Sequence, residues 1–172
     1  MNYVKKLLSR YRDKGILIDT NLLLLYFIGQ FNPSQIPKFK RTSKFTTDDF
    51  HILVSLFRRF NKVITTPNIL TEVSNLSNQL PDDLKRGFYS AFAVQVPSFD
   101  EKHTPSTNIC SQGHFIKFGL TDSGIIESAA SGYLILTDDF KLANFLEKRK
   151  AAVINFNHIR FLSPTISRAR AR

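Results

Sequence analysis

The chain has 172 residues, 42% of them apolar, which suits one domain with a buried core and excludes a disordered chain. Its formal charge of +10 predicts a polyanionic partner, either nucleic acid or an anionic membrane surface, although solubility alone would also explain the charge. The single cysteine excludes a disulfide framework, no signal-peptide pattern opens the chain, and the apolar run at residues 16–28 is too short to span a bilayer. We therefore expect a cytoplasmic protein that does not enter membranes.

The first elements expected are a basic helix and a short buried strand. The helix covers residues 2–13, and the apolar run at residues 16–18 is typical of a buried strand. A helix over residues 21–28 follows, and Thr20 or Asn21 can cap its first turn.

A loop over residues 31–47, which contains prolines and several cations, leads into a helix over residues 50–60 with apolar residues on one face. Residues 63–65 form the second predicted strand. Thr66 and the proline after it start the next helix, because proline suits the first helical position. Another helix follows Pro81.

Residues 97–113 show no clear pattern and are expected to be a loop or a broken helix. Thr121 can cap a helix that begins at Asp122 and ends near residue 131, where a glycine follows. The remaining elements are a strand at residues 134–136, a helix over residues 139–150 and a strand at residues 152–154.

Alternating strands and helices predict an α/β fold, with three α/β/α layers around a mostly parallel central sheet. We expect a single domain over residues 1–163 and a flexible basic tail over residues 164–172. Functional sites in such folds lie at the carboxyl ends of the strands.

Acidic residues stand at that edge of the predicted sheet. Asp19 ends the first strand, and Asp138 and Asp139 end the third. Glu72 lies in the second turn of the helix after the second strand, and Asp122 starts the helix that leads into the third. Carboxylates gathered in one place repel one another unless a cation is present, and oxygen ligands suit Mg²⁺ or Mn²⁺.

Each acid also has an ordinary explanation when it is considered alone. Asp19 could simply cap a helix, Asp122 and Asp139 suit the positive end of a helix dipole, and Glu72 could be a surface residue. Their joint placement favours a metal site. Asp138 and Asp139 both remain candidates for the acid after the third strand.

Four segments resemble, in order, the motifs of the PIN-domain family, and together they span most of the chain. They are ILIDTNLL at residues 16–23, TPNILTEV at 66–73, GLTDS at 119–123 and LILTDD at 134–139, where the Thr-x-Asp pattern points to Asp139. The resemblance implies a PIN-like fold and a metal-dependent endoribonuclease acting on RNA. Many members of the family are toxins of toxin–antitoxin pairs, which implies a cognate antitoxin protein as a partner; we also consider a homodimer.

We expect three roles, and three of the acids have two of them. The catalytic set is Asp19, Glu72, Asp122 and Asp139. The metal ligands are Asp19, Asp122, Asp139 and Asp138. The substrate-binding set is Thr20, Asn21, Thr137, Lys40 and Arg41. Attack by a metal-activated water would leave a 5′-phosphate and a 3′-hydroxyl.

Two hypotheses from other classes remain open. One is a non-catalytic nucleic-acid-binding or regulatory module on the same fold, which would need no metal cluster. The other is a phospho-acceptor domain built on Asp19, which would leave Glu72 and Asp122 without a role. The sequence contains no phosphate-binding Gly-x-x-x-x-Gly-Lys loop, no Gly-x-Gly-x-x-Gly and no His-Glu-x-x-His motif.

Overall fold

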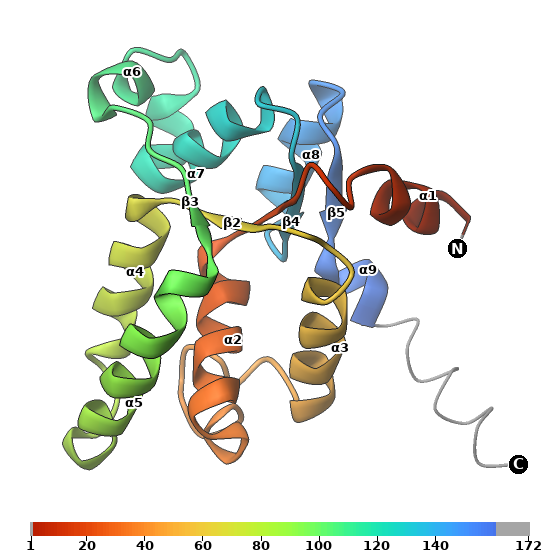
Figure 1. Ribbon diagram of the computed structural model, residues 1–172. Helices are drawn as coiled ribbons and strands as arrows, with labels where there is room; N and C mark the ends of the chain where they lie inside the picture. Colours follow the sequence, from red (N-terminus) through yellow and green to blue (C-terminus); the bar gives the residue numbers. More distant parts are fainter. Residues whose placement is uncertain (1, 161–172) are drawn as a thin grey trace, which may run out of the picture.

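The computed structural model describes residues 2–160, so the predicted basic tail at residues 164–172 lies outside the described residues. Its centre is a five-stranded sheet in the order β3-β2-β1-β4-β5, with every neighbouring pair parallel (Figure 1). The strands are β1 (Ile16–Ile18), β2 (Val63–Thr65), β3 (Asp100–Glu101), β4 (Leu134–Thr137) and β5 (Val153–Asn155). The predicted α/β fold with a parallel central sheet is confirmed.

The apolar runs that predicted the strands are buried because helices cover both faces of the sheet. Strand β1 lies in the middle, where Ile16 pairs with Val63 on one side and with Leu134 on the other. All three residues of β1 are fully buried. A parallel strand covered on both faces needs apolar side chains on both, which explains why these runs do not alternate with polar residues.

Helices lie in two groups with the sheet between them (Figure 1). Helices α2, α3, α4 and α5 form one group, in which α2 contacts the other three, while α7 and α8 lie on the other side of the sheet and contact β4. The helices are α1 (Asn2–Arg10), α2 (Thr20–Phe31), α3 (Thr47–Phe57), α4 (Pro67–Ser77), α5 (Asp82–Gln95), α6 (Ser106–Cys110), α7 (Phe115–Ala129), α8 (Phe140–Lys148) and α9 (Phe156–Arg160). None of the described helices is both long enough and apolar enough to cross a membrane.

Several predicted details were wrong. Helix α2 is capped by Asp19, whose carboxylate accepts the N–H of Leu22, so the capping role considered for Asp19 is confirmed and the caps predicted at Thr20 or Asn21 are wrong. The stretch at residues 97–113 contains a fifth strand, β3, and the short helix α6. Strand β3 is two residues long and polar, so apolar periodicity does not reveal it. Edge strands of this kind often carry charge.

The helix that carries Asp122 also starts earlier than predicted. Helix α7 begins at Phe115 rather than at a cap on Thr121, and it is kinked at Gly119, where the backbone has φ +70° and ψ −171°. That conformation is essentially restricted to glycine. Asp122 therefore lies three residues beyond the kink, in the first turn of the second segment of α7.

Candidate functional site

Asp19 follows β1 directly and is held by three hydrogen bonds. One carboxylate oxygen accepts the N–H of Leu22 at 3.0 Å, and the other accepts the backbone N–H of Asp138 at 3.0 Å and the hydroxyl of Thr137. The side chain is almost fully buried. Burial and the charge of Asp138 raise the pKa of Asp19 to about 7, although the three hydrogen bonds act in the opposite direction. Asp19 is thus fixed in position but costly to ionise.

Asp138 comes directly after β4, and a residue far away in the sequence neutralises its charge. Its carboxylate forms an ion pair with the ammonium group of Lys44 and accepts a hydrogen bond from the Asn21 amide at 3.0 Å. The Asp138 side chain is 4% exposed, whereas that of Lys44 is 51% exposed. Asn157 donates to the backbone oxygen of Asp138 at 2.8 Å. Both carboxylate oxygens of Asp138 therefore have partners within the protein.

Glu72 lies on α4 and contacts the start of α2. The hydroxyl of Thr20 donates to one of its carboxylate oxygens at 2.8 Å. The second oxygen of Glu72 accepts no hydrogen bond from any described residue. The contact joins α2 and α4, and it turns one face of the Glu72 carboxylate toward Thr20.

Asp122 on α7 and Asp139 before α8 are the remaining members of the acidic group, which also contains Asp19, Glu72 and Asp138. Burial and the negative charges of Asp139 and Glu72 together raise the pKa of Asp122 to about 6, although the charge of Lys141 opposes them. Asp139 caps α8, and one of its carboxylate oxygens accepts the backbone N–H groups of Lys141 at 2.6 Å and Leu142 at 3.1 Å. Within the described residues, the Asp122 carboxylate forms neither a hydrogen bond nor an ion pair. Asp122 is therefore a partly buried acid whose nearest charged neighbours are mostly acids.

The donor atoms suit a hard divalent cation. Each of these acids offers carboxylate oxygen, and the oxygens that accept no hydrogen bond from a described residue belong to Asp122, Glu72 and Asp139. Among the described residues, no three His, Cys, Asp or Glu side chains are already grouped closely enough to form a metal site. Asp138 is less suited to hold a cation because Lys44 and Asn21 already occupy its oxygens. The arrangement thus favours Asp139 over Asp138.

The structure brings together most of the residues that the sequence singled out. Asp19 interacts with Asp138, and Asp122 interacts with Asp139 and Glu72. Thr137 joins the two sets, because its hydroxyl donates to Asp19 and accepts the backbone N–H of Asp139. Thr20, Asn21 and Thr137 each donate a hydrogen bond to one of these acids, so their observed role is to orient carboxylates. Their contact with a substrate stays a prediction.

The two cations predicted to bind substrate lie apart from these contacts. Lys40 and Arg41 are exposed, and the guanidinium of Arg41 donates to Gln79 at 2.9 Å. Lys44 from the same loop instead forms an ion pair with Asp138, whereas the sequence predicts only that the cations of this loop could contact phosphates. Nothing local in the sequence marks Lys44, because its partner Asp138 lies 94 residues away.

Histidines do not take part in the acidic group. His51, His103 and His158 are exposed, and His114 is buried beside Glu127, with 3.5 Å between the ring nitrogen Nε2 and the carboxylate. Within the part of the chain that the structure describes, no histidine forms a hydrogen bond or ion pair with the five acids. The arrangement offers no pair of histidines for acid–base chemistry on a ribose hydroxyl.

No protein-family model matches the chain, and no curated protein matches it either. Its function is therefore inferred from the residues and from their geometry.

Proposed function

We propose that the chain is a metal-dependent endoribonuclease of the PIN-like kind, with Asp19, Glu72, Asp122 and Asp139 at its active site. The observation that carries the proposal is the state of Asp122. Its carboxyl is partly buried, has no hydrogen-bond donor among the described residues, and has its pKa raised to about 6 by burial and by two neighbouring acids. A protein that maintains such an arrangement bears an electrostatic cost that a divalent cation would relieve.

Mg²⁺ or Mn²⁺ fits the donor set, which consists of carboxylate oxygens without sulfur or imidazole. We assign the cation to Asp122 and Asp139, with Asp19 acting through a water molecule because both of its carboxylate oxygens already accept hydrogen bonds. When bound, the cation would lower the pKa of a coordinated water and neutralise charge that develops on the phosphoryl oxygens.

The chain's own groups supply positioning and charge. Three hydrogen bonds fix Asp19, and the Thr20 hydroxyl orients Glu72, whose second oxygen remains able to accept a proton from an attacking water. Lys44 places a half-exposed ammonium beside the acids, where it neutralises Asp138 and offers a contact to a phosphate of the substrate.

RNA as the substrate is inferred from the motifs that resemble the PIN family and from the charge of +10. The phospho-acceptor hypothesis is less favoured because Asp19 is almost fully buried and both of its oxygens already accept hydrogen bonds. A non-catalytic module would have no use for the unpaired Asp122. An antitoxin partner and a homodimer stay predictions.

The proposal is tested by the cleavage of a mixed-sequence RNA at neutral pH, with Mn²⁺ and with excess chelator. Wild-type protein should cleave only with the metal. Glu72→Gln keeps an acceptor for Thr20 but loses the charge, and should reduce the rate by about 100-fold or more. Glu147→Gln, on the exposed surface of α8, is the matched control and should cleave as wild type does. Equal activity of the two variants, or cleavage that persists in chelator, would contradict the proposal.

A further inference from the structure

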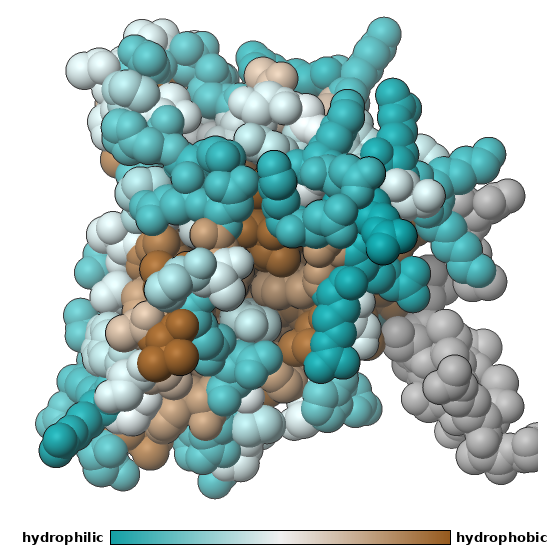
Figure 2. All heavy atoms as spheres, in the orientation of Figure 1, coloured by the Kyte–Doolittle hydropathy of each residue, from teal (hydrophilic) through white to brown (hydrophobic). Residues whose placement is uncertain are grey.

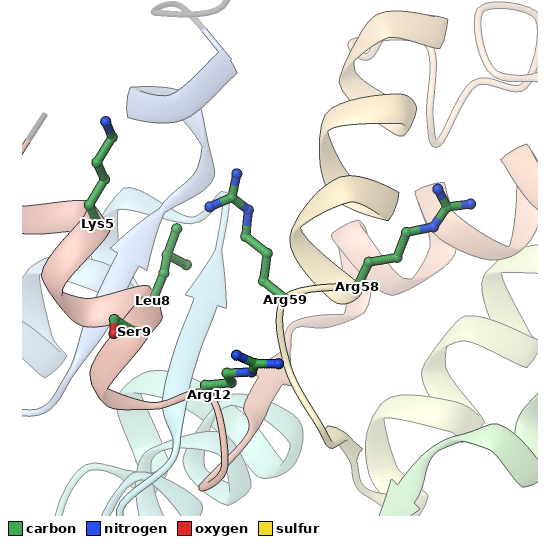
Figure 3. A pocket seen from close by; sticks show the side chains of 6 residues that line it. All are labelled: Lys5, Leu8, Ser9, Arg12, Arg58 and Arg59. Carbon is green, nitrogen blue, oxygen red and sulfur yellow. The ribbon is translucent and has the colours of Figure 1, made fainter.

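A hollow lined by cations lies between α1 and the turn that joins α3 to β2. Its volume is about 470 Å³, which lies within the range of small-molecule sites. The residues around it are Lys5, Leu8, Ser9, Arg12, Arg58 and Arg59. In Figure 3, Arg12 and Arg59 point toward the gap between the two elements, whereas Lys5 and Arg58 extend outward at its rim. The described residues of the lining thus offer four cations and one hydroxyl, and none of them is an acid.

The cations of this hollow are not neutralised by the described part of the chain. None of Lys5, Arg12, Arg58 and Arg59 forms an ion pair or a side-chain hydrogen bond with a described residue. The acid next to Arg12 in sequence, Asp13, accepts instead the amide of Asn61 at 2.6 Å. Several like charges at one place repel one another, so an anion bound among them would be stabilised.

Buried side chains and backbone hydrogen bonds hold the two sides of the hollow together. Leu7 and Leu8 anchor α1 in the core, where both are buried. The backbone oxygen of Arg12 accepts the N–H of Asn61 at 3.0 Å, and the N–H of Ile16 donates to the oxygen of Lys62 at 3.1 Å. These bonds fasten the segment after α1 to the turn after α3. The cations are therefore presented by fixed backbone, which lowers the entropic cost of binding a ligand.

The position of the hollow separates it from the acids. Arg12 precedes β1, and Arg58 and Arg59 precede β2, so the hollow lies at the amino ends of these parallel strands. The acids follow the strands, at the opposite edge of the sheet. Three-residue strands put about 10 Å of sheet between the two edges. A ligand held here does not compete for the oxygens of the acidic group.

We propose that this hollow binds the phosphate backbone of single-stranded RNA, as a second site away from the acids. Guanidinium groups match phosphate oxygens in geometry and charge, and the Ser9 hydroxyl adds a further donor. The choice of RNA over another phosphate-bearing ligand rests on the function proposed above. Phosphate recognition itself rests only on the lining.

The test measures binding by fluorescence anisotropy in excess chelator, so that no cleavage occurs. The probe is a labelled single-stranded RNA, and inorganic tripolyphosphate is titrated separately by calorimetry. Arg12→Gln/Arg59→Gln removes two charges from the hollow. Arg86→Gln/Lys148→Gln removes two exposed charges from α5 and α8 that form no ion pair with a described residue, and is the matched control. Thermal unfolding of both variants establishes that they are folded.

The proposal predicts that the hollow variant binds RNA about tenfold more weakly than the control. It also predicts that the slope of log K against the logarithm of the salt concentration becomes shallower by about 1.4, which is the contribution of two phosphate contacts to a single strand. Equal affinities of the two variants would overturn it. Loss of tripolyphosphate binding with unchanged RNA binding would also overturn it, by assigning the hollow to a free phosphate ligand.

The two proposals fail separately. If RNA is bound through the hollow but is not cleaved with Mn²⁺, the nuclease function fails and the second site stands. If the hollow variant binds RNA as tightly as the control and RNA is cleaved, the second site fails alone.

Discussion

Asp122→Asn should make the metal-free protein more stable at neutral pH while removing the nuclease activity that we propose. The substitution keeps the size of the side chain and removes a charge that no described residue neutralises by direct contact. Asparagine is a clean replacement here because the Asp122 carboxylate accepts no hydrogen bond from the described residues.

The magnitude follows from the pKa of Asp122, which is about 6 instead of the ordinary 3.8. That difference corresponds to about 3 kcal/mol, at roughly 1.4 kcal/mol per pH unit. Because the side chain is partly exposed, solvent screening reduces the expected gain to about 1–2 kcal/mol. In a chain of this size, such a gain raises the melting temperature by about 3–6 °C.

The effect has a defined dependence on pH. An acid whose pKa is raised on folding binds more protons in the folded state, so the wild type loses stability as the pH rises from 3.8 to about 6. The difference between Asp122→Asn and wild type should therefore be near zero at pH 4 and complete above pH 7. Urea unfolding in chelator at pH 4, 6 and 8 measures it.

A matched control is Asp82→Asn on α5, where an exposed acid has its pKa lowered by the hydrogen bond and charge of Lys85. Removing that acid should bring no gain in stability at any pH. If Asp122→Asn were destabilising, or if its gain did not depend on pH, Asp122 would not be under electrostatic strain and our reasoning about the site would be refuted.

Three further predictions concern other parts of the site. Lys44→Met leaves Asp138 buried without its ammonium partner, so it should lower the free energy of unfolding in urea by about 1–2 kcal/mol. Adding Asp138→Asn should recover most of that loss. Full stability of the single variant would contradict the ion pair. Glu72→Gln should change the free energy of unfolding by less than about 0.5 kcal/mol while its activity falls, because it can still accept the threonine hydroxyl; a large loss of stability would assign Glu72 a structural role. Gly119→Ala should lower the free energy of unfolding by about 1–3 kcal/mol through backbone strain alone, because an added Cβ meets open space. The control is Gly113→Ala, which also meets open space but has no positive φ, and it should cost less. Equal costs of the two variants would contradict the backbone strain.

The central strands were predictable from sequence because they obey a simple physical rule. Residues 16–18 and 134–136 are short apolar runs, and residues 63–65 are a β-branched segment that ends in Thr65. A strand covered on both faces favours such segments. The edge strand β3 was not predictable in this way. Its residues Asp100 and Glu101 bury little apolar surface, and their pairing with β2 depends on backbone hydrogen bonds that carry no sequence pattern.

That Asp19, Asp138 and Asp139 lie at one edge of the sheet was predictable, because parallel strands place their carboxyl ends there. Their individual surroundings were not. The partners of Asp138 are 117 residues away at Asn21 and 94 residues away at Lys44, and only the fold brings them together. The kink at Gly119 was not predictable either. The sequence shows that a glycine precedes Asp122, but it does not specify the backbone conformation of that glycine.

The central claim is that the acids drive hydrolysis through a divalent cation, and end-group analysis of cleaved RNA tests it most directly. Purified protein is incubated with RNA and Mn²⁺ at neutral pH, and the termini of the products are determined. Attack by an activated water predicts 5′-phosphate and 3′-hydroxyl ends, with no products from Asp122→Asn under the same conditions. Products that end in a 2′,3′-cyclic phosphate, formed equally by the wild type and this variant, would show that the acids of this site are not the catalytic groups.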